Sequence, residues 1–240
     1  MSKTQQVSAG NLRCLLSGEP EFLRQWLEVR GWQQMALSLG VIVAGSGTYG
    51  AAMGCWRAPL QGLFVAIKLP LIILLTTLGN SVLNSMLAPL LGLNLTFRQS
   101  CSSILMSFTI ASAILGSFSP LAAFLVWNAP PLTSNLQTSS GTYSLIQLTH
   151  VAVIAFAGIV ANFRLVQLLT QLSGSVAAAR RVLFGWLAGN LFLGSQLSWL
   201  LRPFIGAPNL PVEFLRAAAF KGNFYESVYR SLLRVLDVSN

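Results

Sequence analysis

Five long apolar runs, nearly free of charge, constrain the fold of this chain more than any other feature. The first extends from Trp32 to Trp56 without one charged residue, and a helix needs about 20 apolar residues to cross a bilayer. Four more runs follow, over residues 62–91, 101–127, 144–163 and 182–201. The sequence therefore predicts an all-α polytopic transmembrane bundle of about five spans, with amphipathic interfacial helices at both ends of the chain.

Composition points the same way. Only 9% of the residues are charged and the mean hydropathy is +0.65, whereas about a quarter of the residues in soluble domains are charged. The formal charge is +9, but the basic residues stand beside apolar runs, where they suit orientation in a bilayer and attraction to anionic lipid. We expect membrane lipids as partners and no nucleic acid. Cys14, Cys55 and Cys101 lack metal-site spacing, so we expect no metal and no cofactor.

The chain divides into three parts. Residues 1–31 precede the first span, residues 32–201 form the bundle, and residues 202–240 form a tail. Residues 1–16 lack the pattern of a cleavable signal. Ser17 can cap a short helix that follows it in the sequence. This helix would have one apolar face and one charged face. Such a helix lies either on the membrane surface or against the bundle.

Small residues recur at helical spacing in the first and last spans. Ser46, Gly50 and Gly54 follow one another every four residues, and Gly185 and Gly189 repeat this spacing. Small side chains let the backbones of two helices approach closely in a membrane. We interpret both faces as tight helix-packing surfaces rather than ligand sites.

The polar side chains inside the predicted spans include three asparagines and the single histidine that we single out. Asn80 and Asn84 are one turn apart on the same face of the second run, which also carries Lys68 and Pro70 and should be tilted, kinked or partly interfacial. Asn190 and the single histidine, His150, belong to later spans. Hydrogen bonding between helices is the expected role of such groups. A polar transport path is the alternative for Asn80 and Asn84, and a functional site is the alternative for His150.

The tail combines prolines with a second amphipathic pattern. Arg202 and Pro203 end the last span at an interface, and Asn223 with Glu226 has capping-box spacing. The tail helix would lie on lipid or in the groove of a partner protein. Its predicted interface residues are Arg202, Pro203, Phe224, Tyr225, Tyr229 and Arg230.

Loop charges predict the orientation. Residues 128–143 carry no Lys or Arg, whereas the next connection holds Arg164, Arg180 and Arg181. Short cytoplasmic loops carry an excess of basic residues. We therefore predict a cytoplasmic N-terminus and an outer C-terminus, in a bacterial cytoplasmic membrane.

The middle of the chain resembles the Yip1 family of five-span membrane proteins. The likeness rests on the apolar run that ends at residues 78–92, the short loop with Phe97-Arg98-Gln99, and a serine-rich span with Pro120. The acidic N-terminal motif of that family is missing, and Phe108-Thr109 stands in place of its Tyr-Ser. The resemblance implies a membrane adaptor or scaffold without catalytic activity.

The residues themselves predict the same kind of function as the Yip1 resemblance. All six acidic residues lie outside the spans, and no catalytic set can be assembled from this sequence, so we expect no enzyme. We expect a structural or accessory subunit, or a scaffold, that docks other membrane-protein subunits or its own copies. The alternative is a passive channel or transporter component that uses Asn80, Asn84 and His150.

Overall fold

The computed structural model describes most of the chain, and the long elements that it describes are all helices. The described residues are 15–17, 32–93, 95–130, 136–201, 211–216, 219–223 and 225–226. Five helices are each long and apolar enough to cross a membrane: α3 (Trp32–Gly54), α4 (Pro59–Leu90), α5 (Phe97–Asn128), α6 (Leu136–Ser173) and α7 (Val176–Leu201). The prediction of an all-α bundle with five spans is confirmed.

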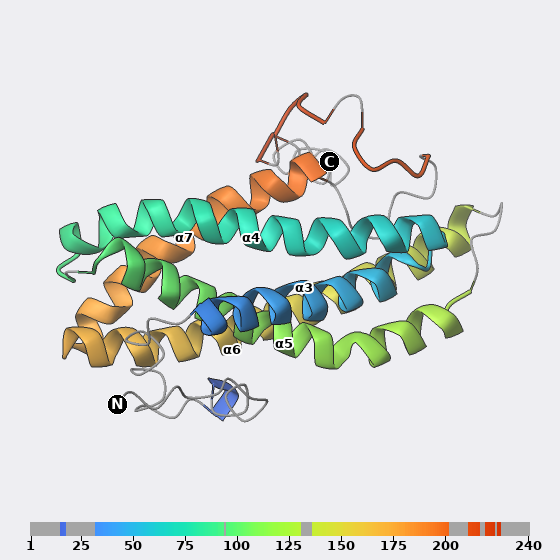
Figure 1. The fold of residues 1–240 in the computed structure, drawn as a ribbon. Coiled ribbons are helices and arrows are strands. Elements are labelled where there is room, and N and C mark those ends of the chain that lie inside the picture. The colour runs from blue at the N-terminus through green and yellow to red at the C-terminus, as the bar shows by residue number, and fades with distance from the viewer. Residues whose placement is uncertain are drawn as a thin grey trace, which may run out of the picture.

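The helices alternate in direction, which defines two ends of the bundle (Figure 1). The Trp32 end holds the start of α3, the α4–α5 turn and the α6–α7 turn. The Trp56 end holds the α3–α4 turn, the α5–α6 connection and the end of α7. Because five helices of the described chain alternate in direction, α3 begins and α7 ends at opposite ends of the bundle.

Most of the helices extend beyond their predicted bounds: α6 begins at Leu136 instead of residue 144, and α7 begins at Val176 instead of residue 182. α4 continues through Pro70 and Pro89 as one helix of 32 residues. α6 extends to Ser173, where the sequence predicted a loop from Arg164 onward. Leu165, Leu168 and Leu169 are almost fully buried, so the apolar face of α6 continues past Arg164 and supports the extra helix. The α6–α7 turn is therefore short, with Gly174 at φ 63°.

The start of α5 is fixed by its own side chains. The Thr96 hydroxyl accepts a hydrogen bond from the Gln99 backbone N–H at 3.3 Å, and the Thr96 N–H donates to the Gln99 side chain at 3.0 Å. This capping box satisfies two free donors of the helix. The capping box fixes where α5 begins after the α4–α5 turn.

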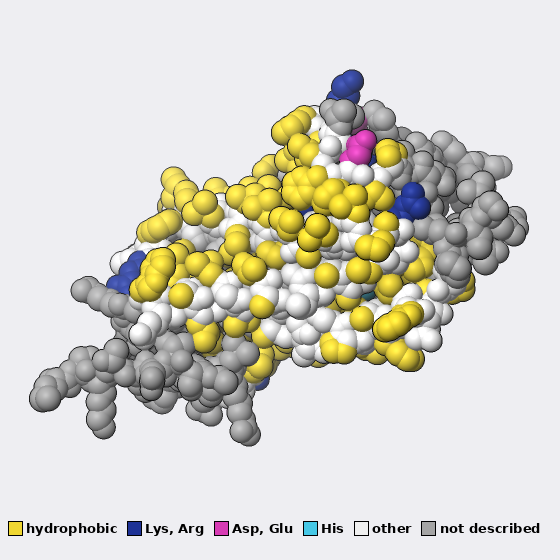
Figure 2. All heavy atoms as spheres, turned by 45° about the vertical axis from the view of Figure 1, so that its right-hand side comes forward, with side chains coloured by type: hydrophobic (Ala, Val, Ile, Leu, Met, Phe, Trp, Pro, Cys, Tyr) yellow, Lys and Arg dark blue, Asp and Glu magenta, His cyan; other side chains and the backbone are white. Residues whose placement is uncertain are grey.

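The face of the bundle in Figure 2 carries many exposed hydrophobic side chains between its two ends. Large side chains such as Leu78, Phe124 and Ile159 are more than half exposed. A soluble protein rarely leaves so much contiguous apolar surface uncovered. Together with five helices of spanning length, this surface defines an integral membrane protein.

The predicted helix after Ser17 falls on residues 18–31, which lie outside the described residues. Leu15, Leu16 and Ser17 are themselves helical, so Ser17 belongs to a helical turn. Leu15 is buried in a cluster with Met106 and Leu168, between α5 and α6. The Arg164 side chain donates a hydrogen bond to the Leu16 carbonyl at 2.9 Å, which holds this segment at the Trp32 end.

Candidate functional site

The small residues of α3 lie where neighbouring backbones approach most closely. A Cβ placed on Gly50 would lie 2.7 Å from the Val65 carbonyl oxygen, and one on Gly54 would lie 2.8 Å from that of Gln61. Both glycines therefore face α4. The Ser46 hydroxyl donates to the Ile42 carbonyl of its own helix at 2.5 Å. These small residues therefore pack helices of the same chain together.

The tightest crossing joins α3 to α5, at residues that the predicted packing faces did not include. A Cβ on Gly45 would lie 2.1 Å from the Ser112 carbonyl oxygen, and one on Gly116 would lie 2.9 Å from the Gly45 Cα. Gly116 follows Ser112 by four residues, so the small-residue spacing that indicated the other packing faces could also have indicated this one. The two helices can touch here only because neither residue has a side chain.

The predicted packing face of α7 meets α4. A Cβ on Gly185 would lie 3.0 Å from a methyl group of Leu91, and one on Gly189 would lie 3.0 Å from the Asn80 side-chain oxygen. Gly194 faces Thr76. The two helices run in opposite directions, so a line of small residues on α7 follows a line of polar residues on α4.

We call this contact the polar seam: Thr76, Asn80 and Asn84 of α4, with Gly189 and Asn190 of α7. The Asn80 amide donates a hydrogen bond to the Asn190 side-chain oxygen. Thr76, Asn80 and Asn84 are at most 4% exposed. Within the described part of the chain, the Thr76 hydroxyl, the Asn80 oxygen and both Asn84 amide atoms have no hydrogen-bond partner.

His150 lies at a different interface. The Tyr49 hydroxyl and the His150 Nδ1 share a hydrogen bond of 2.7 Å, and the two rings meet edge to face with centroids 5.4 Å apart. Tyr49 is fully buried and His150 is 3% exposed. The pair joins α3 to α6, whereas the polar seam joins α4 to α7, so the structure does not bring His150 together with Asn80 and Asn84.

Lys68 is a buried cation on α4, and the tail covers it. Its side chain is 1% exposed. The Lys68 ammonium donates to the Glu213 carbonyl at 3.5 Å and lies 4.9 Å from the centre of the Phe214 ring and 5.8 Å from that of Phe64. The Phe64 and Phe214 rings also meet edge to face. We call this arrangement the lysine clamp.

The depth of the lysine clamp follows from the length of α4. Lys68 and Leu90 are 22 positions apart, or about 33 Å of helix, which is close to the ~30 Å hydrocarbon thickness of a bilayer. A bilayer interface at Leu90 would place Lys68 close to the opposite interface. The first two turns of α4 would then extend past the hydrocarbon, and the partly interfacial character of this segment stays a prediction.

A second contact ties the tail to α7. The Ser195 hydroxyl donates to the Tyr225 hydroxyl at 3.0 Å, and the Tyr225 ring stacks on Phe192. The Glu226 N–H donates to the Asn223 side chain at 2.8 Å, the helix cap that the spacing predicted. The remaining predicted interface residues lie outside the described residues: Arg202, Pro203, Phe224, Tyr229 and Arg230.

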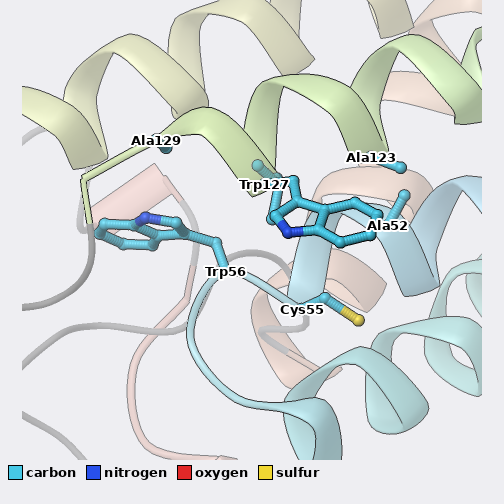
Figure 3. A pocket seen from close by; sticks show the side chains of 7 residues that line it. Ala52, Cys55, Trp56, Ala123, Trp127 and Ala129 are labelled. Atoms are coloured by element: carbon cyan, nitrogen blue, oxygen red, sulfur yellow. The ribbon is translucent and has the colours of Figure 1, made fainter.

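A half-open apolar pocket lies at the Trp56 end, between α3 and α5 (Figure 3). Its volume is about 480 Å³. The Trp56 ring is held by a hydrogen bond from its indole N–H to the Pro130 carbonyl at 3.2 Å. The lining suits an acyl chain better than a polar substrate, and consists of Ala52, Cys55, Trp56, Ala123, Val126, Trp127 and Ala129.

Among the described residues, no three His, Cys, Asp or Glu side chains come close enough to hold a metal ion. Comparison with protein-family models, with curated proteins and with solved structures finds no match for this chain. The Yip1 resemblance stays a prediction. The bundle defines the class as an integral membrane protein, in which five helices of the described residues are long and apolar enough to cross a membrane.

Proposed function

We propose that the protein is a non-catalytic accessory subunit or scaffold, which presents its tail to a partner protein at the membrane surface. The observation that carries this proposal is the lysine clamp. A buried, charged side chain is expensive in a membrane and usually marks function. Here Lys68 holds a backbone carbonyl and an aromatic ring of the tail.

The tail surface beyond these contacts supports docking. Ala219 is almost fully buried, so the segment packs on the bundle, yet Phe220 is 81% exposed and Leu215 is 47% exposed. Exposed apolar side chains beside polar ones are typical of protein interfaces. We propose an apolar or amphipathic helix of another membrane protein as the occupant.

The predicted packing faces contribute indirectly. Gly50, Gly54, Gly185 and Gly189 face helices of the same chain. They make the bundle rigid, which fixes where the tail is held, and the outer helix faces and the tail remain for partners. The proposal includes the predicted orientation, with the N-terminus in the cytoplasm, and the predicted location in a bacterial cytoplasmic membrane. This orientation places the tail on the outer side.

The test is co-purification in mild detergent with Lys68→Met, compared with the unchanged chain. Lys221→Met is the matched control, because Lys221 is an exposed tail lysine outside the lysine clamp. We expect a stoichiometric companion with the unchanged chain and with Lys221→Met, and at least a several-fold loss with Lys68→Met. A companion that stays bound in all three, or no companion at all, contradicts the proposal.

A passive channel or transporter component is the second candidate, and the polar seam favours it. Asn84 is fully buried with no partner among the described residues, as expected of a group that meets a passing solute. Flux into vesicles should then fall with Asn80→Ala. His150→Ala tests whether the Tyr49 pair takes part, and unchanged flux in both variants argues against the channel.

A further inference from the structure

The apolar pocket at the Trp56 end follows from the way in which α3 and α5 cross. Both helices run towards that end (Figure 1), and their backbones are in contact where Gly116 faces Gly45. About one turn further along, the Thr48 and Ser119 hydroxyls share a hydrogen bond of 3.1 Å. The members of each pair are 71 positions apart in the sequence, so the two helices run in parallel with one register.

The same register brings two alanines to the walls of the pocket. Ala52 and Ala123 are also 71 positions apart, and each lies about two turns beyond the contact of Gly45 with Gly116. Both line the pocket. Pro120 lies in α5 between that contact and the pocket, and a proline inside a helix removes one backbone hydrogen bond and allows a bend. Small side chains beyond a close crossing therefore leave the hollow between the two helices.

Two tryptophans indicate the depth of the pocket in the membrane. Trp56 and Trp127 continue the register of the two helices and line the pocket (Figure 3). The Trp56 ring is buried and bonded to the Pro130 carbonyl, whereas Trp127 is 89% exposed. Tryptophan is enriched where the hydrocarbon meets the headgroups. The pocket therefore lies at the depth of the headgroup-proximal part of the lipid chains.

The size and the lining of the pocket favour hydrocarbon. A cavity of about 150 Å³ holds one benzene molecule, so a volume of about 480 Å³ has room for about 18 hydrocarbon carbons. The lining consists of alanine, valine and tryptophan side chains with the Cys55 thiol, and carries no charge. Water is a poor occupant of such a site, because it needs two to four polar partners.

We propose that the pocket between α3 and α5 binds the hydrocarbon of a membrane phospholipid, with the headgroup beside Trp127. Lipid chains surround helices of spanning length and reach a half-open pocket at this depth. A chain in the bilayer is already in hydrocarbon, so its preference for the pocket comes from van der Waals contact with the walls. This proposal is independent of the proposed function, because it uses neither the lysine clamp nor the tail.

The test maps the residues that a lipid probe contacts. The full chain is placed in phosphatidylcholine nanodiscs with a small share of phosphatidylcholine that carries a photoreactive diazirine in the headgroup-proximal half of one chain. After illumination, peptide mass spectrometry locates the attached probe. We expect residues 52–56 and 123–129 to be labelled about 5-fold or more above Leu148 and Val151 of α6.

Leu148 and Val151 are the internal reference, because both are more than half exposed and apolar. They also match the pocket in depth. The Phe118 and Phe156 rings are in contact and α5 and α6 run in opposite directions, so residues that follow Phe118 lie level with residues that precede Phe156.

Two variants fill the pocket from its opposite walls, Ala123→Phe and Ala52→Leu. Ala123 is exposed towards the hollow, so a phenyl ring can occupy it without overpacking the core, and labelling of the pocket should fall by about 10-fold or more. Ala155→Phe is the matched control, because Ala155 is an exposed alanine of α6, and it should leave the labelling unchanged. Thermal unfolding in detergent verifies that each variant is folded.

The lipid proposal is overturned if the pocket is labelled no more than the reference residues, if both filled variants keep the label, or if the control loses it equally. A dimer in native mass spectrometry that Ala123→Phe separates would assign the pocket to a second copy of the chain, which also overturns the proposal.

Discussion

The Tyr49 hydroxyl lies 2.7 Å from the His150 Nδ1 and joins two helices whose backbones have little other contact. Both side chains are buried inside the spans, so water cannot replace the bond. α3 reaches α4 and α5 through close backbone crossings. It reaches α6 through the longer tyrosine and histidine side chains.

Tyr49→Phe should lower the stability of the bundle. The variant keeps the ring but leaves the His150 nitrogen without its partner, which costs about 1–3 kcal/mol for a buried group. Thermal unfolding in detergent measures the change. Thr149→Val is the control, because the Thr149 hydroxyl donates to the Leu145 carbonyl of its own helix and joins no two helices among the described residues. Equal stability of Tyr49→Phe and the unchanged chain would contradict a role for this bond.

Gly45→Ala and Gly40→Ala should have opposite effects, although both lie in α3. A Cβ on Gly45 meets the Ser112 backbone, whereas one on Gly40 has nothing within 4 Å. Overpacking at Gly45 should cost about 1–3 kcal/mol or more. Alanine at Gly40 should stabilise the helix by about 0.5–1 kcal/mol. Chemical denaturation measures both, and a stable Gly45→Ala variant would show that α3 and α5 do not cross there.

Asn84→Leu should raise stability, unlike most changes to a buried residue. It removes two polar atoms that have no partner among the described residues, and each such group costs about 1–3 kcal/mol when buried. Asn190→Leu is the contrast, because it takes away the acceptor of the Asn80 amide and should destabilise the bundle. Destabilisation by Asn84→Leu would mean that this amide has a hydrogen-bond partner, and would remove the observation that favours the channel alternative.

The spans could be predicted from sequence because the bilayer fixes both their length and their polarity. Glycine spacing also indicated close helix packing, but it could not indicate which neighbouring helix each glycine would contact. The end of α6 was missed because one arginine looked like a loop boundary, although the apolar face continues past Arg164. The pairing of Tyr49 with His150 depends on how two distant helices are rotated, and no local pattern records that.

Phe214→Ala should loosen the tail and expose it to protease. The change removes the ring closest to the Lys68 ammonium and the edge-to-face contact with Phe64. A cation–π contact of this kind contributes about 0.5–2 kcal/mol, and cleavage follows the population of the opened segment when opening is fast. Trypsin should therefore cut after Arg216 and Lys221 faster by about 2- to 30-fold. Phe220→Ala is the control, because Phe220 is 81% exposed and lies outside the lysine clamp. Equal cleavage rates in the two variants would show that the lysine clamp does not hold the tail.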